Sequence, residues 1–505
     1  MSEFPDSAPA MVPKPADPEG PSHTISAREE LCHRGGRSTI PLMKTIRIGN
    51  AAGFWGDNTD APRRLAESGS LDYLTLEYLA ELTLSILAHL KSKNPDAGFV
   101  TECPNVVRSL VPSFKTQTNL RLVTNGGGMN PVGCAKAVAA VLAGEGLGHI
   151  KVAACSGDDV FAGMPDHIAA GEPFTHFETG EDLVSDGSPK VNIASANAYL
   201  GAAGIVEALA AGAQIVLTGR IADASLVTGP AMHEFGWDWD DWEKLGGATV
   251  AGHLIECGAQ STGGIYSRWS EQLDLSNVGY PIAEMNEDGT CVITKPVGTG
   301  GVVNTETVAE QLIYEIGDPR RYMTPDVVAD FSNVTLQQQG DDRVFVSNGT
   351  GTAAPETYKV SMAYKDGYAG SGMIVVAGPN AIAKAKQSGE LIRQRVREAG
   401  FELAHYNYEL LGAGGSLDGM NLGTGEPWEV VLRVAARDPN RAAIDRMLRE
   451  LAPLVTSGPP GVTGYTGARS KSHPVLAYWP STVHRDRLSH EVQTRTAADW
   501  IRVSG

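Results

Sequence analysis

Three carboxylates in this sequence have the types and positions suited to proton transfer: Glu77, Asp158 and Asp159. Each follows an apolar run, LDYLTL for Glu77 and IKVAAC for the two aspartates. Carboxyl groups act as general acid and base once burial moves their pKa values apart. We therefore predict that these residues are catalytic. The alternative is that strand ends are polar merely because they leave the core.

Cys257 is the fourth predicted catalytic residue and the best candidate for a nucleophile. It lies in the segment GHLIECGAQSTGG, four residues after His253. In a helix this spacing places both side chains on one face, where an imidazole could lower the pKa of the thiol or share a ligand with it. A buried structural cysteine is the alternative interpretation.

The remaining candidate residues are predicted to bind an anionic substrate. Arg220 is suited to hold a carboxylate or phosphate, although Arg-x-x-Asp at a strand end can also be a local ion pair. The segment NGGGMNP places three glycines ahead of a helix N-terminus, which can hold an anion or form only a tight turn. The candidates are Asn50, Asp57, Asn125, Gly126, Gly127, Gly128, Asn130, Arg220, Asp223, His253 and Lys295.

No cofactor is identified by a sequence motif. The dinucleotide fingerprint GxGxxG in its strand–turn–helix setting and the phosphate-binding motif GxxxxGK[ST] are both missing from the sequence. This disfavours an oxidoreductase that uses a nicotinamide cofactor. Clustered carboxylates could coordinate Mg²⁺, so this ion is the one cofactor that we consider.

These residues require a scaffold that brings strand ends together. Between residues 44 and 335, short apolar runs alternate with helical patterns, which is typical of a parallel sheet with crossover helices. In such sheets, ligands bind at the carboxyl ends of the strands. We predict an α/β fold, either doubly wound or barrel-like. The expected strands are 45–50, 72–78, 120–125, 150–155 and 214–219, and the expected helices are 81–93, 134–145 and 201–212.

A second domain of α+β type is predicted over residues 340–485. Its expected strands are RVFVSN, TYKVSMAY, GMIVVAG and EVVLRVAAR, with helices over 380–399 and 440–453. Residues 1–42 contain seven prolines and are expected to be a disordered tail. Residues 486–505 are expected to be a C-terminal tail.

The charge of the chain limits its partners. It has 41 Lys and Arg against 59 Asp and Glu, a formal net charge of −18, which argues against nucleic-acid and anionic-membrane surfaces. The first residues hold no apolar run of signal-peptide length, and no stretch approaches 18 apolar residues. We expect a cytoplasmic, soluble protein that binds a small acyl or carboxylate substrate and forms a homo-oligomer.

Several segments together resemble the acyclic terpene utilisation AtuA family. They are IGNAAGFWGD, LDYLTLEYLAELT, VTNGGGMNP, SGDDV, SANAYLGAAGIVEALAAGAQIVLTGRIADASL, HEFGWDWDDW, GHLIECGAQSTGG and ITKPVGTGG. The similarity runs over about residues 44–480. It implies a place in pathways that degrade citronellol- and geraniol-type terpenoids through acyl-CoA intermediates.

The favoured hypothesis is an enzyme that acts on an acyl-CoA or carboxylate intermediate as a hydratase, lyase or isomerase. Glu77 and Asp158 or Asp159 would move protons, while Arg220 or the NGGGMNP turn would hold the anionic group. The alternative is a non-catalytic protein that binds an acyl intermediate or organises other enzymes of the pathway.

Overall fold

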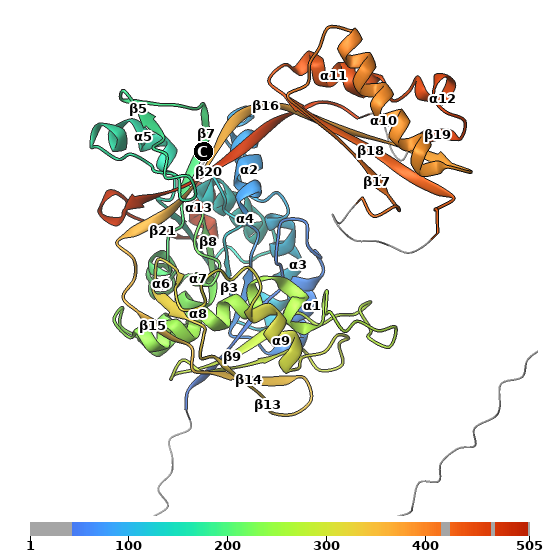
Figure 1. Cartoon of the computed structure of the whole chain (residues 1–505). Helices are drawn as coiled ribbons and strands as arrows, with labels where there is room; N and C mark the ends of the chain where they lie inside the picture. The colour runs from blue at the N-terminus through green and yellow to red at the C-terminus, as the bar shows by residue number, and fades with distance from the viewer. Residues whose placement is uncertain (1–42, 416–424, 466–469, 503–505) are drawn as a thin grey trace, which may run out of the picture. The chain divides into compact units, whose positions relative to one another are not determined.

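The computed structural model describes residues 43–415, 425–465 and 470–502, which form a mixed α/β structure (Figure 1). The predicted tail over residues 1–42 lies outside the described residues. Within the described part of the chain, no helix is long and apolar enough to cross a membrane.

The largest sheet has its parallel strands in the middle and antiparallel strands at both sides. Its order is β13-β14-β10-β9-β1-β2-β3-β8-β4-β21. The parallel strands are β1 (Thr45–Asn50), β2 (Tyr73–Leu76), β3 (Arg121–Thr124), β8 (Ile215–Thr218) and β4 (Lys151–Ser156). They are the five strands predicted from the sequence. The antiparallel strands are β9 (Ile282–Asn286), β10 (Cys291–Thr294), β14 (Arg343–Ser347), β13 (Thr335–Gln338) and β21 (Glu491–Thr496).

Both faces of this sheet are buried. Successive side chains of a strand point to opposite faces, so Leu122 and Val123 enter two different hydrophobic cores. Helices α1 (Ala61–Gly69), α2 (Glu81–Lys93), α3 (Cys103–Thr116), α4 (Pro131–Gly144) and α13 (Ala497–Arg502) contribute to the core of Leu122. Helices α5 (Val160–Ala169), α6 (Ala203–Ala210), α7 (Ser225–Phe235) and α8 (Trp242–Glu256) contribute to the core of Val123. The α/β prediction is confirmed, and the open edges at β13 and β21 exclude the barrel.

The connections change face between the neighbouring strands β3 and β8. Helix α4 follows β3 and packs in the core of Leu122, whereas α7 follows β8 and packs in the core of Val123. In doubly wound sheets, such a switch leaves a crevice at the carboxyl ends of the two strands, where ligands bind. The fold therefore directs attention to the residues that follow β3 and β8.

A second sheet is antiparallel and is built around one long strand. Strand β16 (Thr357–Ala377) pairs with β18 (Glu429–Asp438), β19 (Val462–Tyr465), β20 (His473–His484) and β7 (Ile193–Ala198), and β17 (His405–Leu411) pairs with β18. The predicted strands TYKVSMAY and GMIVVAG are both parts of β16. The register shifts between Lys365 and Tyr368, where Gly367 has a φ of 76°, so the turn-like residues form a bulge instead of ending the strand.

Helices cover one face of the β17-β18-β16 sheet (Figure 1). They are α10 (Ala381–Glu398) and α11 (Arg441–Arg449), followed by the short α12 (Leu454–Ser457). The remaining elements are β5 (Val184–Ser185), β6 (Ser188–Pro189), α9 (Thr305–Leu312), β11 (Tyr322–Met323), β12 (Val328–Asp330), β15 (Thr350–Thr352) and two 3₁₀ helices, Gly258–Thr262 and Arg485–Arg487.

The domain boundaries at 335/340 and 485/486 stay predictions. Two segments, however, form other elements than we expected from the sequence. RVFVSN, expected in the second domain, forms β14 of the large sheet. The expected C-terminal tail, residues 486–505, contains β21 and α13. Strand β21 pairs with β4, and the buried Trp500 of α13 packs in the core of Leu122. A short polar segment thus completes a sheet edge, which its composition does not reveal.

Candidate functional site

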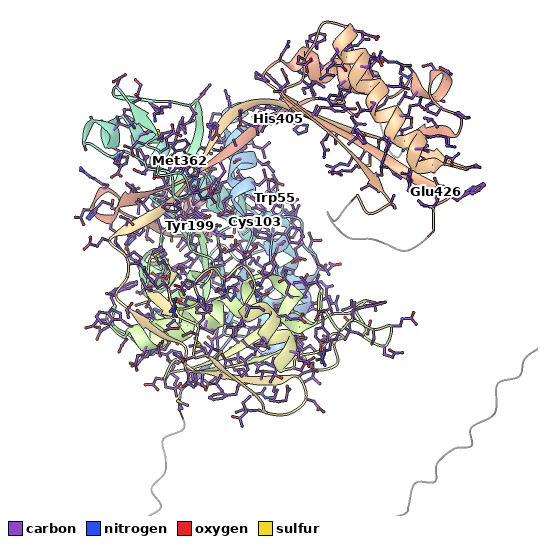
Figure 2. All side chains as sticks on the ribbon, in the orientation of Figure 1. Trp55, Cys103, Tyr199, Met362, His405 and Glu426 are labelled. Atoms are coloured by element: carbon purple, nitrogen blue, oxygen red, sulfur yellow. The ribbon has the colours of Figure 1, made fainter. Side chains whose placement is uncertain are left out.

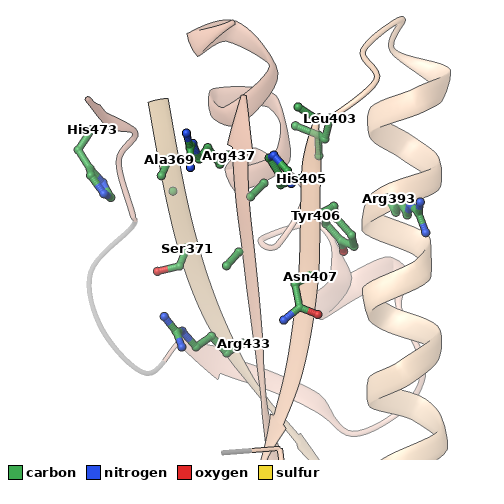
Figure 3. Close-up of a pocket in the computed structure, with 14 residues that line it drawn as sticks. Ala369, Ser371, Arg393, Leu403, His405, Tyr406, Asn407, Arg433, Arg437 and His473 are labelled. Carbon is green, nitrogen blue, oxygen red and sulfur yellow. The ribbon is translucent and has the colours of Figure 1, made fainter. Parts of the chain in front are cut away.

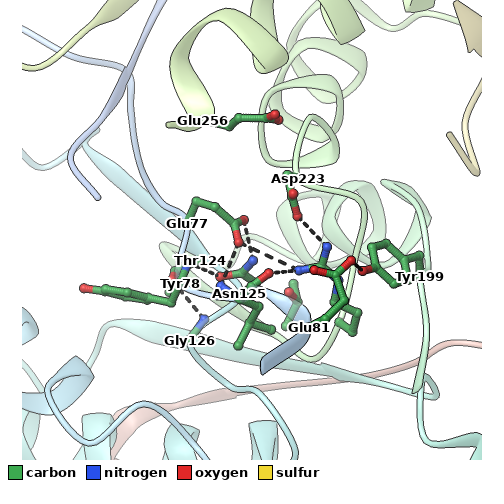
Figure 4. A network of polar contacts seen from close by, with 12 residues as sticks. Glu77, Tyr78, Glu81, Thr124, Asn125, Gly126, Tyr199, Asp223 and Glu256 are labelled. Carbon is green, nitrogen blue, oxygen red and sulfur yellow. Dashed lines mark hydrogen bonds and ion pairs between the residues drawn. The ribbon is translucent and has the colours of Figure 1, made fainter. Parts of the chain in front are cut away.

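The ends of β2 and β3 bring Glu77 and Asn125 together (Figure 4). Arg220, which follows β8, lies beside Glu77. The amide nitrogen of Asn125 donates a hydrogen bond to Glu77 Oε2, and its oxygen accepts one from the Tyr78 backbone N–H at 2.8 Å. The Leu79 N–H donates to Glu77 Oε1 at 2.7 Å. Both the oxygen and the nitrogen of the Asn125 amide therefore help to hold the turn after β2.

Arg220 is a buried cation whose guanidinium group contacts two carboxylates, a backbone carbonyl and an aromatic ring. Its Nη2 lies 2.9 Å from Asp223 Oδ1 and its Nη1 lies 3.9 Å from Glu77 Oε1. Nη1 also donates to the Leu79 carbonyl, and the guanidinium lies 3.9 Å from the centre of the Tyr199 ring. Nε of this guanidinium is buried and has no hydrogen-bond partner among the described residues. The predicted anion clamp is thus largely occupied by Asp223 and Glu77.

The two carboxyl groups beside Arg220 differ in exposure. Glu77 is buried, and burial raises its pKa well above the ordinary value although Arg220 opposes the shift. Asp223 keeps 32% of its side-chain surface accessible. Burial raises the pKa of Asp223 to about 7; Arg220 opposes this shift and the charge of Glu256 adds to it. Asp223 is therefore partly accessible, although its Oδ1 beside Arg220 is buried, and its pKa lies near neutral pH.

A third carboxylate, Glu81, lies in the first turn of α2 and contacts Tyr199, whose ring packs against Arg220. It accepts hydrogen bonds from the Tyr199 hydroxyl and from Lys359 Nζ, the latter at 3.2 Å. Burial opposes ionisation, but the Tyr199 hydrogen bond and the charges of Lys359 and Arg220 lower the pKa of Glu81 to about 2. Glu81 is ionised at neutral pH and anchors Tyr199, which Figure 2 shows among the packed side chains.

Asp158 and Asp159 have different environments. Asp158 is buried and accepts hydrogen bonds from the Arg220 backbone N–H at 2.9 Å and from Asn197 at 2.8 Å. Burial raises its pKa to about 6, although these two bonds lower it. Asp159 is exposed and caps α5 through bonds from the Phe161 and Ala162 N–H groups. Asp158 thus supports the Arg220 backbone, and Asp159 points away from the network.

The NGGGMNP segment forms the predicted cap but is closely packed. Asn130 Oδ1 accepts the Gly133 N–H at 2.9 Å, and Pro131 begins α4. A Cβ at Gly127 would lie 2.5 Å from the Thr218 carbonyl, and one at Gly128 would lie 2.4 Å from Leu87. All three glycines, Gly126 included, are buried. Close packing accounts for these glycines.

Asn50 and Asp57 stabilise the loop that follows β1. Asn50 is buried and donates to the carbonyls of Ala52 and Ile255 at 2.9 and 2.7 Å. Asp57 accepts the Gly53 N–H at 2.9 Å and the Tyr280 hydroxyl at 2.7 Å. Asn50 therefore joins the end of β1 to the end of α8.

Lys295 lies at the end of β10, separated from β1 by β9. Its Nζ donates to the Thr299 carbonyl at 2.8 Å and pairs with Asp342 at 2.9 Å. No contact joins it to Arg220 within the described residues. It holds its own glycine-containing loop.

His253 and Cys257 do not pair. His253 Nδ1 lies 3.0 Å from Glu256 Oε1 and its Nε2 lies 2.8 Å from the Gln311 carbonyl. Burial and the charge of Glu256 raise the pKa of the Cys257 thiol to about 12. The imidazole is engaged elsewhere, so the expected activation of the thiol by His253 is not what the structure has.

Three residues of this network are missing from the sequence prediction: Glu81, Tyr199 and Glu256. Glu256 does have a local signal, because it lies one helical turn from the predicted residue His253. Glu81 begins the predicted helix 81–93. Tyr199 follows β7, which pairs with the distant β16, and no sequence spacing indicates that contact.

A metal-binding group is absent from the described ranges, where no three His, Cys, Asp or Glu side chains are grouped to hold a metal ion.

A hollow of about 760 Å³ on the β17-β18-β16 sheet is lined in part by basic side chains (Figure 3). Two of them are already paired, Arg433 with Glu409 at 2.9 Å and Arg437 with Asp366. This hollow contains none of the predicted site residues.

Comparisons with known proteins gave one finding. The model of a family described as "Acyclic terpene utilisation family protein AtuA" matches residues 46–494. The comparisons with curated proteins and with solved structures gave no match.

Proposed function

Because the chain belongs to the acyclic terpene utilisation family AtuA, which implies a role in acyclic terpene utilisation, we propose that it is an enzyme of proton transfer. Its substrate would be a branched acyl-CoA or carboxylate intermediate, and its reaction that of a hydratase, lyase or isomerase. Asp223 would act as the general base that removes a proton from the carbon beside the carbonyl group.

The observation that carries this proposal is the state of Asp223. It is partly accessible, it follows β8 at the switch point of the sheet, and its pKa is raised to about 7. A general base is most effective when its pKa lies near the working pH. Perturbed carboxyl groups are characteristic of functional sites.

Arg220 has a positioning role in this proposal. Its guanidinium is held by Leu79, Tyr199 and Glu77, and it fixes the Asp223 carboxylate at 2.9 Å. This differs from a free clamp for the substrate anion.

Exposed apolar side chains at the same edge of the sheet suit a branched hydrocarbon chain. Leu82 and Ile86 on α2 are 66% and 43% exposed, and Phe54 in the loop after β1 is 55% exposed. Their positions follow β1 and β2, whose carboxyl ends border the network. They would provide contact area for an isoprenoid acyl group.

Deuterium exchange tests the proposal because it detects proton abstraction whatever the product is. The full chain is incubated in D₂O with a panel of straight, branched and isoprenoid acyl-CoA thioesters, with Mg²⁺ or with a chelator, and incorporation is followed by mass spectrometry. We expect deuterium exchange with a branched acyl-CoA of the panel. The comparison of samples with Mg²⁺ and with chelator tests whether Mg²⁺ is required. Binding without exchange or product would favour a non-catalytic acyl-binding protein. Light scattering of the same sample tests the proposed homo-oligomer.

A further inference from the structure

The hydrogen bonds of His253 define where its protons are. Nε2 lies 2.8 Å from the backbone carbonyl of Gln311, and a carbonyl oxygen can only accept, so Nε2 carries a proton. In a neutral imidazole, Nδ1 is then an acceptor. Yet Nδ1 lies 3.0 Å from Glu256 Oε1, which is also an acceptor when ionised. A hydrogen bond between them therefore requires one further proton, carried by Glu256 as an acid or by an imidazolium.

Both members of the pair are buried, and one oxygen of the Glu256 carboxyl group lacks a hydrogen-bond partner among the described residues. His253 is 2% exposed, and its ring packs 5.7 and 5.4 Å from the rings of Tyr322 and Phe331. Glu256 Oε2 is buried and has no hydrogen-bond partner among the described residues. Figure 4 shows Glu256 on the side of Asp223 away from the Glu77–Asn125 contact.

Glu256 and Asp223 interact electrostatically. The charge of Glu256 raises the pKa of Asp223, and burial is the larger cause of that shift. The shared proton of His253 and Glu256 supplies the acid.

We propose that the His253–Glu256 pair is a second proton carrier of this site, with Glu256 as the catalytic acid and His253 as its positioning residue. The inference rests on the proposed function and narrows the substrate to an unsaturated or hydroxylated acyl group. A C–H bond of the ligand breaks and its proton goes to Asp223. The Glu256 proton forms a bond to a second ligand atom, either a carbon of a shifted double bond or a departing hydroxyl, which leaves as water. Asp223 then releases its proton to solvent and the Glu256 side takes one up, which restores both carboxyl groups.

Several charged or titratable groups surround the pair and act on its titration. Besides Asp223 after β8, they are Cys257 at the end of α8, Tyr322 on β11 and Glu315 after α9. The Gln311 amide nitrogen donates to the His253 carbonyl at 2.9 Å. Glu315 is exposed and has no hydrogen bond to the pair, so Glu315→Gln is the matched control.

The shared proton can be measured without a substrate. The full chain is prepared with labelled histidine, and the His253 signal is identified by its loss in His253→Gln. At pH 7 we expect either an imidazolium with both ring nitrogens protonated or a carboxylic-acid stretch in the infrared difference between wild type and Glu256→Gln. The absence of both signals would overturn the inference.

Kinetics on an acyl-CoA that exchanges deuterium tests the catalytic part. Glu256→Gln should lower kcat by about 100-fold with little change in KM, and His253→Gln should lower kcat and remove the shared-proton signal. Glu315→Gln should keep the wild-type kcat and the shared-proton signal. Exchange that is lost in Asp223→Asn but unchanged in Glu256→Gln overturns this inference and leaves the proposed function standing. No exchange with any thioester overturns the proposed function, and the shared-proton signal then decides whether the pair carries a proton.

Discussion

Arg220 Nη2 lies 2.9 Å from Asp223 Oδ1 at the end of β8. The two residues are three positions apart, and their ion pair closes the loop that follows the strand. Because Glu77 also lies near Arg220, one cation forms ion pairs with two carboxyl groups. Burial of these carboxyl groups is the main reason why a proton is retained near neutral pH, and neighbouring carboxylates add to the effect.

Removal of Arg220 should destabilise the protein strongly. Arg220→Leu leaves the buried Glu77 and the partly buried Asp223 without their cation, which costs about 3–5 kcal/mol of unfolding free energy. Denaturant unfolding measures this value. Arg63→Leu breaks an exposed pair with Glu67 and should cost less than about 1 kcal/mol. Equal losses in the two variants would contradict the buried ion-pair arrangement.

The glycine turn after β3 offers a second stability prediction. Gly127→Ala places a Cβ 2.5 Å from the Thr218 carbonyl and 2.9 Å from Pro131 Cα, so the backbone must move at a cost of about 1–3 kcal/mol. Gly144 at the end of α4 has no atom within 4 Å of an added Cβ. Gly144→Ala should be neutral or stabilising by up to about 1 kcal/mol. A neutral Gly127→Ala in thermal unfolding would show that the turn is looser than described.

The pH dependence of stability should report on Glu81. Its folded pKa of about 2 lies below the ordinary value of about 4.3, so ionised Glu81 stabilises the fold above about pH 5. This contribution is lost as the pH falls toward 2. Unfolding free energies at pH 5, 4 and 3 should therefore fall more steeply in wild type than in Glu81→Gln. Glu178→Gln, at an exposed position, should follow the wild type, and parallel curves for all three proteins would exclude the effect.

The Cys257 thiol should not act as a nucleophile. Its pKa, raised by burial to about 12, keeps it protonated at pH 7. Cys257→Ser should therefore retain deuterium exchange within a few-fold of wild type. Alkylation by iodoacetamide at pH 7 should be slow. Rapid alkylation together with loss of exchange in Cys257→Ser would restore the nucleophile hypothesis.

The sequence predicts much of the scaffold because local signals are strong there. Apolar runs mark the five parallel strands, and Asn130 with Pro131 marks the start of α4. The strand order is not predictable in this way, because nothing local indicates that β8 lies between β3 and β4. The same limit applies to β21, whose sequence EVQTRT is polar and whose partner lies more than 300 residues away.

The site is predictable only in part, for the same reason. Strand ends identify Glu77, Asn125 and Arg220, which the structure brings together. Spacing alone cannot tell whether His253 turns toward Cys257 or toward Glu256, since i+3 and i+4 share one helix face. Tertiary packing of Gln311 against His253 decides that choice.

The most direct test of the account is the pH dependence of deuterium exchange into a branched acyl-CoA. Asp223 must be ionised to act as base, and its pKa is about 7, so the wild-type rate should rise with pH through about 7 and then level off. Asp223→Asn should lower the rate by about 100-fold or more and remove this titration. Asp159→Asn, at the exposed cap of α5, should behave as wild type. An unchanged rate and pH profile in Asp223→Asn would contradict the central claim.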